Sequence, residues 1–180
     1  MYIDPTVYTS RPENERLAKE MRCYDLLEKL DVKYNRVDHD AANTMEDCAK
    51  AKSILGVKIC KNLLLCNQQK TKFYLLLMAG EKQFVTKDFS KKIGSSRLSF
   101  APPEFMEKFL DITPGSLSVL GLMNDTECEV TLYIDRDVVA EEYFGCHPCI
   151  NTSTLSMKTS DLLDTVIPAT GHDINFVELD

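Results

Sequence analysis

Lys61 and Asn62 are the first neighbours in the chain whose types and setting suit chemistry. The charged side chain and the amide run directly into the apolar tract of residues 63–66. An apolar run of this length, bounded by polar residues, is typical of a strand buried on both faces. Such a strand would hold Lys61 and Asn62 rigidly at its end, which suits a binding or catalytic group. The alternative is a solvated strand end without a further role.

A second candidate is the pair Cys146 and Cys149, separated by two residues. Such a pair is a redox centre where a helix follows, because a helix N-terminus lowers the thiol pKa, or it supplies half of a zinc site. The following residues favour a strand, and the sequence contains no second pair of this kind. We therefore interpret the two cysteines as incidental and expect neither a metal nor a cofactor.

His147 lies between these cysteines and is the better candidate. Gly145 and Pro148 restrict its loop, which could hold the imidazole at the mouth of a pocket. Asn151 and Thr152 follow directly and add polar groups to the same loop. A histidine in such a setting suits catalysis or ligand binding more than a histidine on a regular surface.

The order of the expected helices and strands predicts an α+β fold, a single domain in which helices surround a mixed central sheet. We expect an extended arm over residues 1–12 and a domain over residues 13–180. The expected helices cover residues 13–31, 44–55, 86–93, 103–110, 135–140 and 159–167. Candidate caps are Asn43 or Thr44, Asp135 and Thr159, and Gly56 is expected to end the second helix. The expected strands cover residues 34–39, 58–66, 73–79, 98–100, 129–134, 150–157 and 174–179, and the second and third of them are expected to form a hairpin. Residues 113–128 and 145–149 are expected to be loops.

Composition and charge narrow the class of protein. The 180 residues carry a net charge of −7, yet eleven of the 21 Lys and Arg residues and only two of the 28 acids lie in residues 50–97. This asymmetry permits a basic face that meets a few phosphates, or it is a clustering that folding disperses. The chain has neither a long apolar run nor a leader pattern, and its cysteine count is odd at seven. We expect a cytoplasmic protein with reduced thiols and no membrane contact.

Five segments stand in an order that is informative as a set. They are residues 44–47 (TMED), 61–65 (KNLLL), 97–101 (RLSFA), 113–122 (TPGSLSVLGL) and 145–152 (GCHPCINT). In these segments the chain resembles the YbaK/ProX family of prolyl-tRNA editing domains, relatives of the insertion domain of bacterial prolyl-tRNA synthetase. The resemblance covers roughly residues 13–180 and is greatest to the ProX branch.

The resemblance implies a trans-editing hydrolase that removes alanine wrongly esterified to proline tRNA. Its partner would be the acceptor end of tRNA(Pro), with prolyl-tRNA synthetase as a second partner to consider. The family lysine matches Lys61 and the family histidine matches His147. The Gly-x-x-x-Pro loop of the family falls on Gly115 to Val119, and Val119 stands in place of the proline, which bears on the rigidity of the loop. The expected catalytic residues are Lys61, Gly115 and His147, and the expected substrate-binding residues are Thr44, Asn62, Ser99, Phe100, Ser116, Leu117, Ser118, Val119, Asp135, Pro148, Asn151 and Thr152.

The chemistry asked of such a site is modest. An aminoacyl ester is already activated, so the protein has to place it, admit water and stabilise the developing oxyanion. Backbone N–H groups of the loop from Gly115 to Val119 could stabilise the oxyanion, a ribose hydroxyl could help to activate water, and Lys61 could anchor a phosphate or ribose. The alternatives are deacylation of Cys- or Ser-charged tRNA, a regulatory module that binds tRNA or an amino acid without catalysis, and a thiol-redox protein.

Overall fold

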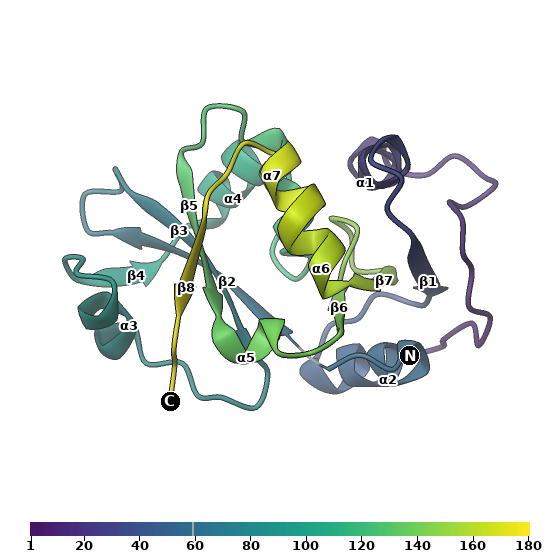
Figure 1. Ribbon diagram of the computed structural model, residues 1–180, viewed down its shortest axis with the longest axis horizontal. Coiled ribbons are helices and arrows are strands. Elements are labelled where there is room, and N and C mark those ends of the chain that lie inside the picture. The colour runs from purple at the N-terminus through teal and green to yellow at the C-terminus, as the bar shows by residue number, and fades with distance from the viewer. Residues whose placement is uncertain (59) are drawn as a thin grey trace.

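Helices and strands alternate along the chain in the computed structural model, which describes residues 1–58 and 60–180 (Figure 1). Ile59, which the sequence analysis assigns to the second strand, lies outside the described residues. The helices are α1 (Ala18–Lys29), α2 (Met45–Leu55), α3 (Thr86–Lys92), α4 (Pro103–Leu110), α5 (Arg136–Val139), α6 (Thr159–Asp161) and α7 (Ile167–Ala169), with the 3₁₀ helix η1 (Val119–Asn124) and the π-helix η2 (Leu162–Val166). The strands are β1 (Tyr34–Asp38), β2 (Cys60–Asn67), β3 (Phe73–Ala79), β4 (Leu98–Phe100), β5 (Val130–Asp135), β6 (Tyr143–Cys146), β7 (Ser153–Lys158) and β8 (Ile174–Val177).

Five strands form the central sheet, in the order β4-β2-β3-β5-β8. The strand β2 pairs antiparallel with β3 and β4, whereas β5 runs parallel to β3 and β8, so the sheet is mixed. The remaining three strands form a smaller antiparallel sheet in the order β1-β7-β6, which lies with α1 and α2 on the other side of the molecule in Figure 1. The predicted α+β fold, a single domain with a mixed central sheet and helices around it, is confirmed.

The two faces of the central sheet carry different cores, because alternate residues of a strand point to opposite sides. On β2, Leu64 and Cys66 belong to the large core, which the sheet shares with α1, α4, η1, η2 and the smaller sheet. Leu65 faces the other way and packs in a small core with Phe89 of α3. The same alternation places Lys61 on the side of Leu65 and Asn62 on the side of Leu64, so the two candidates leave the strand in opposite directions.

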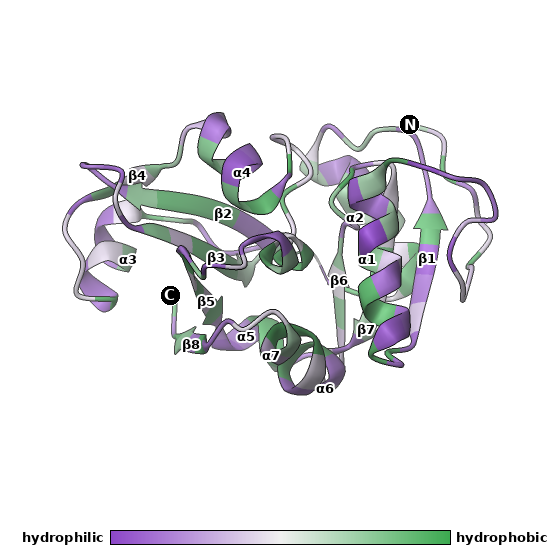
Figure 2. Cartoon of the chain, turned by 90° about the horizontal axis from the view of Figure 1, so that it is seen from above, coloured by the Kyte–Doolittle hydropathy of each residue, from purple (hydrophilic) through white to green (hydrophobic). Residues whose placement is uncertain are grey.

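The smaller sheet is covered on one face by α1 and extended at its edge by the N-terminal arm. The apolar side of α1, with Cys23, Tyr24 and Leu27 fully buried, joins the large core, and Figure 2 shows apolar and polar residues on different sides of this helix. Residues 1–10 run extended beside β1, with antiparallel bridges from Ile3 to His39 and from Tyr8 to Arg36.

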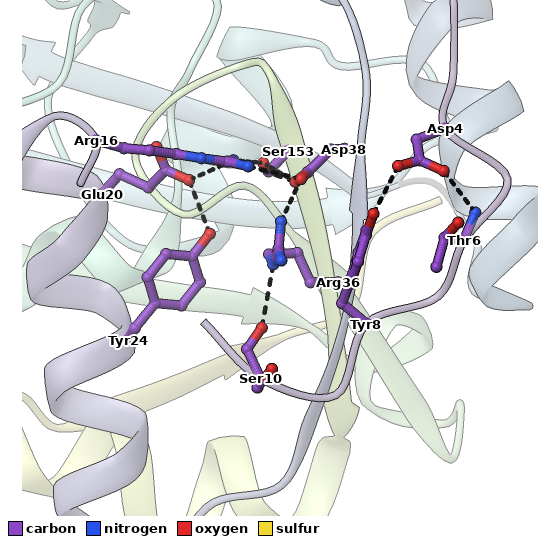
Figure 3. Close-up of polar contacts among 10 residues, drawn as sticks. All are labelled: Asp4, Thr6, Tyr8, Ser10, Arg16, Glu20, Tyr24, Arg36, Asp38 and Ser153. Carbon is purple, nitrogen blue, oxygen red and sulfur yellow. Dashed lines mark hydrogen bonds and ion pairs between the residues drawn. The ribbon is translucent and has the colours of Figure 1, made fainter. Parts of the chain in front are cut away.

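A buried polar network ties the arm, α1 and the smaller sheet together (Figure 3). Asp38 lies between Arg16 and Arg36, accepts a hydrogen bond of 2.7 Å from Arg16, and accepts another of 2.7 Å from the hydroxyl of Ser153. Burial opposes ionisation of Asp38, but the hydrogen bonds from Arg16, Arg36 and Ser153 outweigh it and hold the pKa of this carboxyl well below its usual range. The carboxylate is therefore the charged centre of the network.

Several predicted boundaries are wrong for reasons that lie in tertiary contacts. Helix α1 begins at Ala18, not near residue 13, because Arg16 is held by Asp38 and Ser153 before the first turn. Residues 119–124 form a 3₁₀ helix in the core where a loop was expected. Gly145 and Cys146 end strand β6 and are not loop residues, and Thr159 does not cap its helix because its hydroxyl donates to the carbonyl of Glu141.

Candidate active site

A cleft of about 530 Å³ opens where β2 begins, between α2, the start of α4 and the loop before η1. It brings together three segments that are remote in the sequence, because Lys61, Gly115 and His147 all line it. These are the three residues that the sequence analysis expects to be catalytic. The lining consists of Met45, Cys48, Lys52, Cys60, Lys61, Asn62, Leu63, Leu64, Phe100, Ala101, Pro103, Met106, Pro114, Gly115, Leu117, Cys146 and His147.

Lys61 lies at the wall of the cleft, but its ammonium group is already engaged. The Nζ atom donates a hydrogen bond of 2.6 Å to the backbone carbonyl of Lys82, which follows β3. Lys82 is itself fixed by ion pairs of 3.0 Å to Asp135 and 2.6 Å to Asp137. Asp135, an expected substrate-binding residue, is fully buried outside the cleft lining and caps α5. It can therefore affect Lys61 through Lys82.

Asn62 faces the cleft with an unsatisfied acceptor. Its side-chain nitrogen reaches the carbonyl of Cys60 at 3.5 Å, whereas its Oδ1 atom is buried and has no hydrogen-bond partner among the residues that the structure describes. An orphaned buried acceptor is unusual, since nearly all buried polar atoms are paired. Asn62 thus lies in the cleft wall with its oxygen shielded from solvent, which argues against a simple solvated strand end.

His147 is held in one orientation by the segment that follows it. Its Nδ1 lies 2.9 Å from the carbonyl oxygen of Ser153, and a carbonyl can only accept, so Nδ1 carries the proton. The other nitrogen, Nε2, is then an acceptor, and the nearest polar group to it is the thiol of Cys48 at 3.9 Å. Burial lowers the pKa of His147 to about 4. The imidazole is consequently neutral near pH 7 and presents a lone pair to the cleft.

The loop from Gly115 to Val119 contributes Gly115 and Leu117 to the lining of the cleft. Gly115 has a φ of +93°, a conformation that favours glycine, and Leu117 lines the cleft beside it. Within the described part of the chain, the N–H groups of both residues lack an acceptor. Val119, which the sequence analysis expects at the position of a family proline, is 2% exposed in the large core, and the hydroxyl of Ser118 caps η1 by accepting from the N–H of Leu120. Core packing and this cap therefore hold the loop without the proline.

The other expected substrate-binding residues surround the cleft at different distances from its lining. Phe100 is 59% exposed on its rim, and Thr44 caps α2 by accepting a hydrogen bond of 3.1 Å from the N–H of Asp47, next to Met45 of the lining. Asn151 lies close to Gly115, with its Nδ2 atom 3.8 Å from where a Cβ of residue 115 would stand. Outside the lining, Ser116, Ser118 and Pro148 are buried, and Ser99 and Thr152 are exposed.

The sequence analysis missed three cleft residues that α2 contributes. Met45, Cys48 and Lys52 stand three and four residues apart, the spacing that puts side chains on one face of a helix. This spacing was a usable signal, but the basic and polar character of α2 gave no reason to expect that this side of the helix points into the protein. Lys52 is 4% exposed, which no sequence pattern indicated.

Comparison with known proteins identifies the family. The model of the aminoacyl-tRNA editing domain family matches residues 39–165, which include every residue of the cleft. The chain belongs to this family. It is therefore an enzyme, a hydrolase of the ester bond between an amino acid and tRNA, and tRNA is its partner.

Individual relatives agree with this assignment. The chain is 30% identical over 153 residues to the "Prolyl-tRNA editing protein ProX" of Acetoanaerobium sticklandii, covering 85% of this chain and 93% of the relative. It is 26% identical over 149 residues to the "Prolyl-tRNA synthetase associated domain-containing protein 1" of Danio rerio, covering 82% and 79%. A solved structure of a candidate trans-editing enzyme for prolyl tRNA synthetase shares the fold, with a TM-score of 0.66, 16% identity and coverage of 92% of this chain and 100% of that one. Among the described residues, no helix has the length and apolar character needed to cross a membrane.

Proposed function

We propose that the protein is a trans-editing deacylase that hydrolyses Ala-tRNA(Pro) in the cytosol. The observation that carries the proposal is the cleft, which gathers Lys61, Gly115 and His147 at the end of a rigid strand. The names of the relatives supply proline as the cognate amino acid of the tRNA. The odd number of cysteines suits a reducing compartment. Prolyl-tRNA synthetase is the partner from which such a protein would receive its substrate.

The cleft offers the amino group of the substrate an acceptor. A protonated α-amino group can donate only, and the lone pair on Nε2 of His147 can accept from it. A neutral imidazole is required for this contact, because a protonated one would repel the ammonium group. The low pKa of His147, caused by burial, keeps it neutral at the pH of the cytosol.

The ester carbonyl would then face the loop. The N–H groups of Gly115 and Leu117 are free to donate, and donors of this kind stabilise the oxyanion that forms when water attacks. No side-chain nucleophile is needed, because a ribose hydroxyl of the terminal adenosine can help to activate water. Phe100, exposed at the rim, offers a flat surface on which the adenine base can stack.

Lys61 would act at the wall of the cleft, where its contact with the carbonyl of Lys82 holds its charge in place. In this role it binds a phosphate or a ribose oxygen of the acceptor end as a fixed point charge. Exclusion of amino acids larger than alanine follows from size. A single methyl group contributes only about 1–3 kcal/mol, so alanine and glycine are harder to separate than alanine and leucine.

The test is a panel of tRNA(Pro) charged with alanine, cysteine, serine or proline, with and without prolyl-tRNA synthetase. We expect rapid loss of alanine, little loss of proline, and loss of most activity in Lys61→Ala. Faster release of cysteine or serine would reassign the substrate within the same chemistry. Binding of tRNA without any turnover would make the protein a regulatory module. Full activity of Lys61→Ala would refute the proposed role of that lysine.

A further inference from the structure

Lys52 is a charged side chain built into the floor of the cleft. It lies in the last turn of α2, lines the cleft, and is 4% exposed. Its stem passes close to Gly145: a Cβ on that glycine would stand 3.6 Å from Cε of Lys52, an ordinary contact, and 2.6 Å from Cγ2 of Val57. The position next to Lys52 therefore requires glycine because of Val57, and Lys52 packs beside it.

The charge of Lys52 has no compensating anion within the protein. Among the residues that the structure describes, no carboxylate lies within 4.0 Å of its ammonium group. Its surroundings are three thiols, those of Cys48, Cys60 and Cys146, and the imidazole of His147. For each thiol, burial is the larger influence and raises the pKa, while the charge of Lys52 acts in the opposite direction. The thiols consequently stay protonated and neutral, and the charge remains uncompensated.

A lysine that is 4% exposed and has no counter-charge is costly for a folded protein. A methionine of similar length would fill the same space without that cost. The chain nevertheless places a lysine that is 4% exposed in the lining of a cleft whose other lining residues include open ones, with Met45 46% exposed and Phe100 59% exposed. This arrangement favours a ligand that brings a negative charge to the floor.

We propose that Lys52 is the cation that binds the carboxyl oxygen of the amino acid, first as the oxyanion of the hydrolytic intermediate and then as the carboxylate of the released product. The role of Lys52 toward the ester oxygen rests on the proposed function, whereas its role toward a carboxylate rests on the structure alone. Burial favours this group over a phosphate. The aminoacyl group is the terminal and smallest part of the substrate, so it can reach a side chain that is 4% exposed, whereas the phosphates of the tRNA backbone suit the exposed residues of the lining.

The step that Lys52 would assist is balanced without a further reactant. Water adds to the carbonyl carbon, and the π electrons of the C=O bond move to the oxygen, which becomes the oxyanion beside Lys52. The intermediate collapses when the C=O bond reforms and the bond to the ribose oxygen breaks. One proton of the attacking water goes to the departing ribose oxygen, and the other goes to solvent as the new carboxyl group ionises. The amino acid departs as a zwitterion, whose carboxylate suits Lys52 and whose ammonium group suits the acceptor on His147.

The decisive variant is Lys52→Met, with Lys29→Met, an exposed lysine on α1 outside the basic segment, as the matched control. We expect kcat for Ala-tRNA(Pro) to fall about 10²-fold in Lys52→Met, the usual effect of removing one oxyanion donor, with a smaller change in KM. We also expect its Tm to equal or exceed that of the wild type, because the uncompensated charge is gone. The control should keep both values.

Three outcomes would overturn the proposal. They are a kcat in Lys52→Met within about threefold of the wild type, an equal loss in Lys29→Met, and a fall in Tm that accounts for the loss of activity. Should Lys52→Met fail to fold, Lys52→Gln is measured in the same way. Unfolding of both variants would make Lys52 a packing residue and would equally overturn the proposal.

A second measurement does not depend on the deacylase activity. Acetate, a small carboxylate probe, should raise the Tm of the wild type more than chloride does at the same ionic strength and pH, and this difference should vanish in Lys52→Met. A larger effect of inorganic phosphate, or an acetate effect that persists in Lys52→Met, would refute the carboxylate assignment. If the wild type deacylates no tRNA in the panel, the proposed function fails and the acetate result alone decides the role of Lys52.

Discussion

The buried imidazole of His147 should make the protein lose stability in mild acid. Burial lowers its pKa from 6.5 to about 4 in the folded protein, whereas the unfolded chain keeps the ordinary value. Between these two pH values the unfolded state binds a proton that the folded state does not. The free energy of unfolding therefore falls as the pH decreases from about 6.5 to about 4.

The size of this effect follows from the shift. Since one pKa unit corresponds to about 1.4 kcal/mol, the fall from 6.5 to about 4 amounts to about 3 kcal/mol of stability lost by pH 4. His147→Asn is the variant of choice, because the amide nitrogen of asparagine can take the place of Nδ1 and still donate to the carbonyl of Ser153. The variant has no group that titrates in this range.

The assay is urea unfolding of both proteins at several pH values between about 7 and 4. We expect the difference in unfolding free energy between wild type and His147→Asn to shift by about 3 kcal/mol across this range, in the direction that penalises the wild type in acid. Carboxylates that titrate at the low end affect both proteins and cancel in the difference. Parallel pH curves would refute the reasoning, because they would mean that His147 is protonated as easily in the folded protein as in the unfolded chain.

Three further changes test the supports of the site by urea unfolding. Thr44→Ala should lower the free energy of unfolding by about 1 kcal/mol because the α2 cap is lost, whereas Thr44→Ser should keep it. Equal losses of stability in the two variants would contradict the capping role. Gly145→Ala should cost about 1–3 kcal/mol, and Val57→Ala should relieve it in the double variant, because the new Cβ meets Val57; strict additivity would argue against this contact. Asp38→Asn should cost about 3 kcal/mol, since it leaves Arg16 and Arg36 without their carboxylate, and a loss below 1 kcal/mol would show that water compensates them.

Local patterns predicted most elements of the fold, because the signals were strong within short segments. Thr44 and Gly56 mark the ends of α2 by a capping side chain and a left-handed glycine, and both are found in these roles. The tract after Asn62 and the segment Phe73–Ala79 form the expected hairpin in register. Asp135 caps the short helix α5, as its position before the turn predicted.

The features that the sequence could not predict depend on contacts between remote segments. The inward face of α2 becomes visible only when Gly145 of β6 lies against Lys52, and these residues are 93 positions apart. The division of the strands into two sheets depends on the pairing of β1 with β7, which no local pattern specifies. The family resemblance supplied Lys61, Gly115 and His147, and the structure brings these three together. It did not indicate that the ammonium group of Lys61 is held by Lys82.

The N-terminal arm has a consequence for how the molecule behaves among its own copies. One edge of β1 is paired with β7, and the arm takes up backbone groups at the other edge, with hydrogen bonds of 2.9 Å and 2.7 Å between Tyr8 and Arg36. An unpaired strand edge is a template on which another chain can add a strand, the first step of many aggregates. Arg11 fixes the end of the arm to α1 through Asp25 and Glu28. The arm thus covers the free edge of β1, and its removal should lower the solubility of the protein before it affects catalysis.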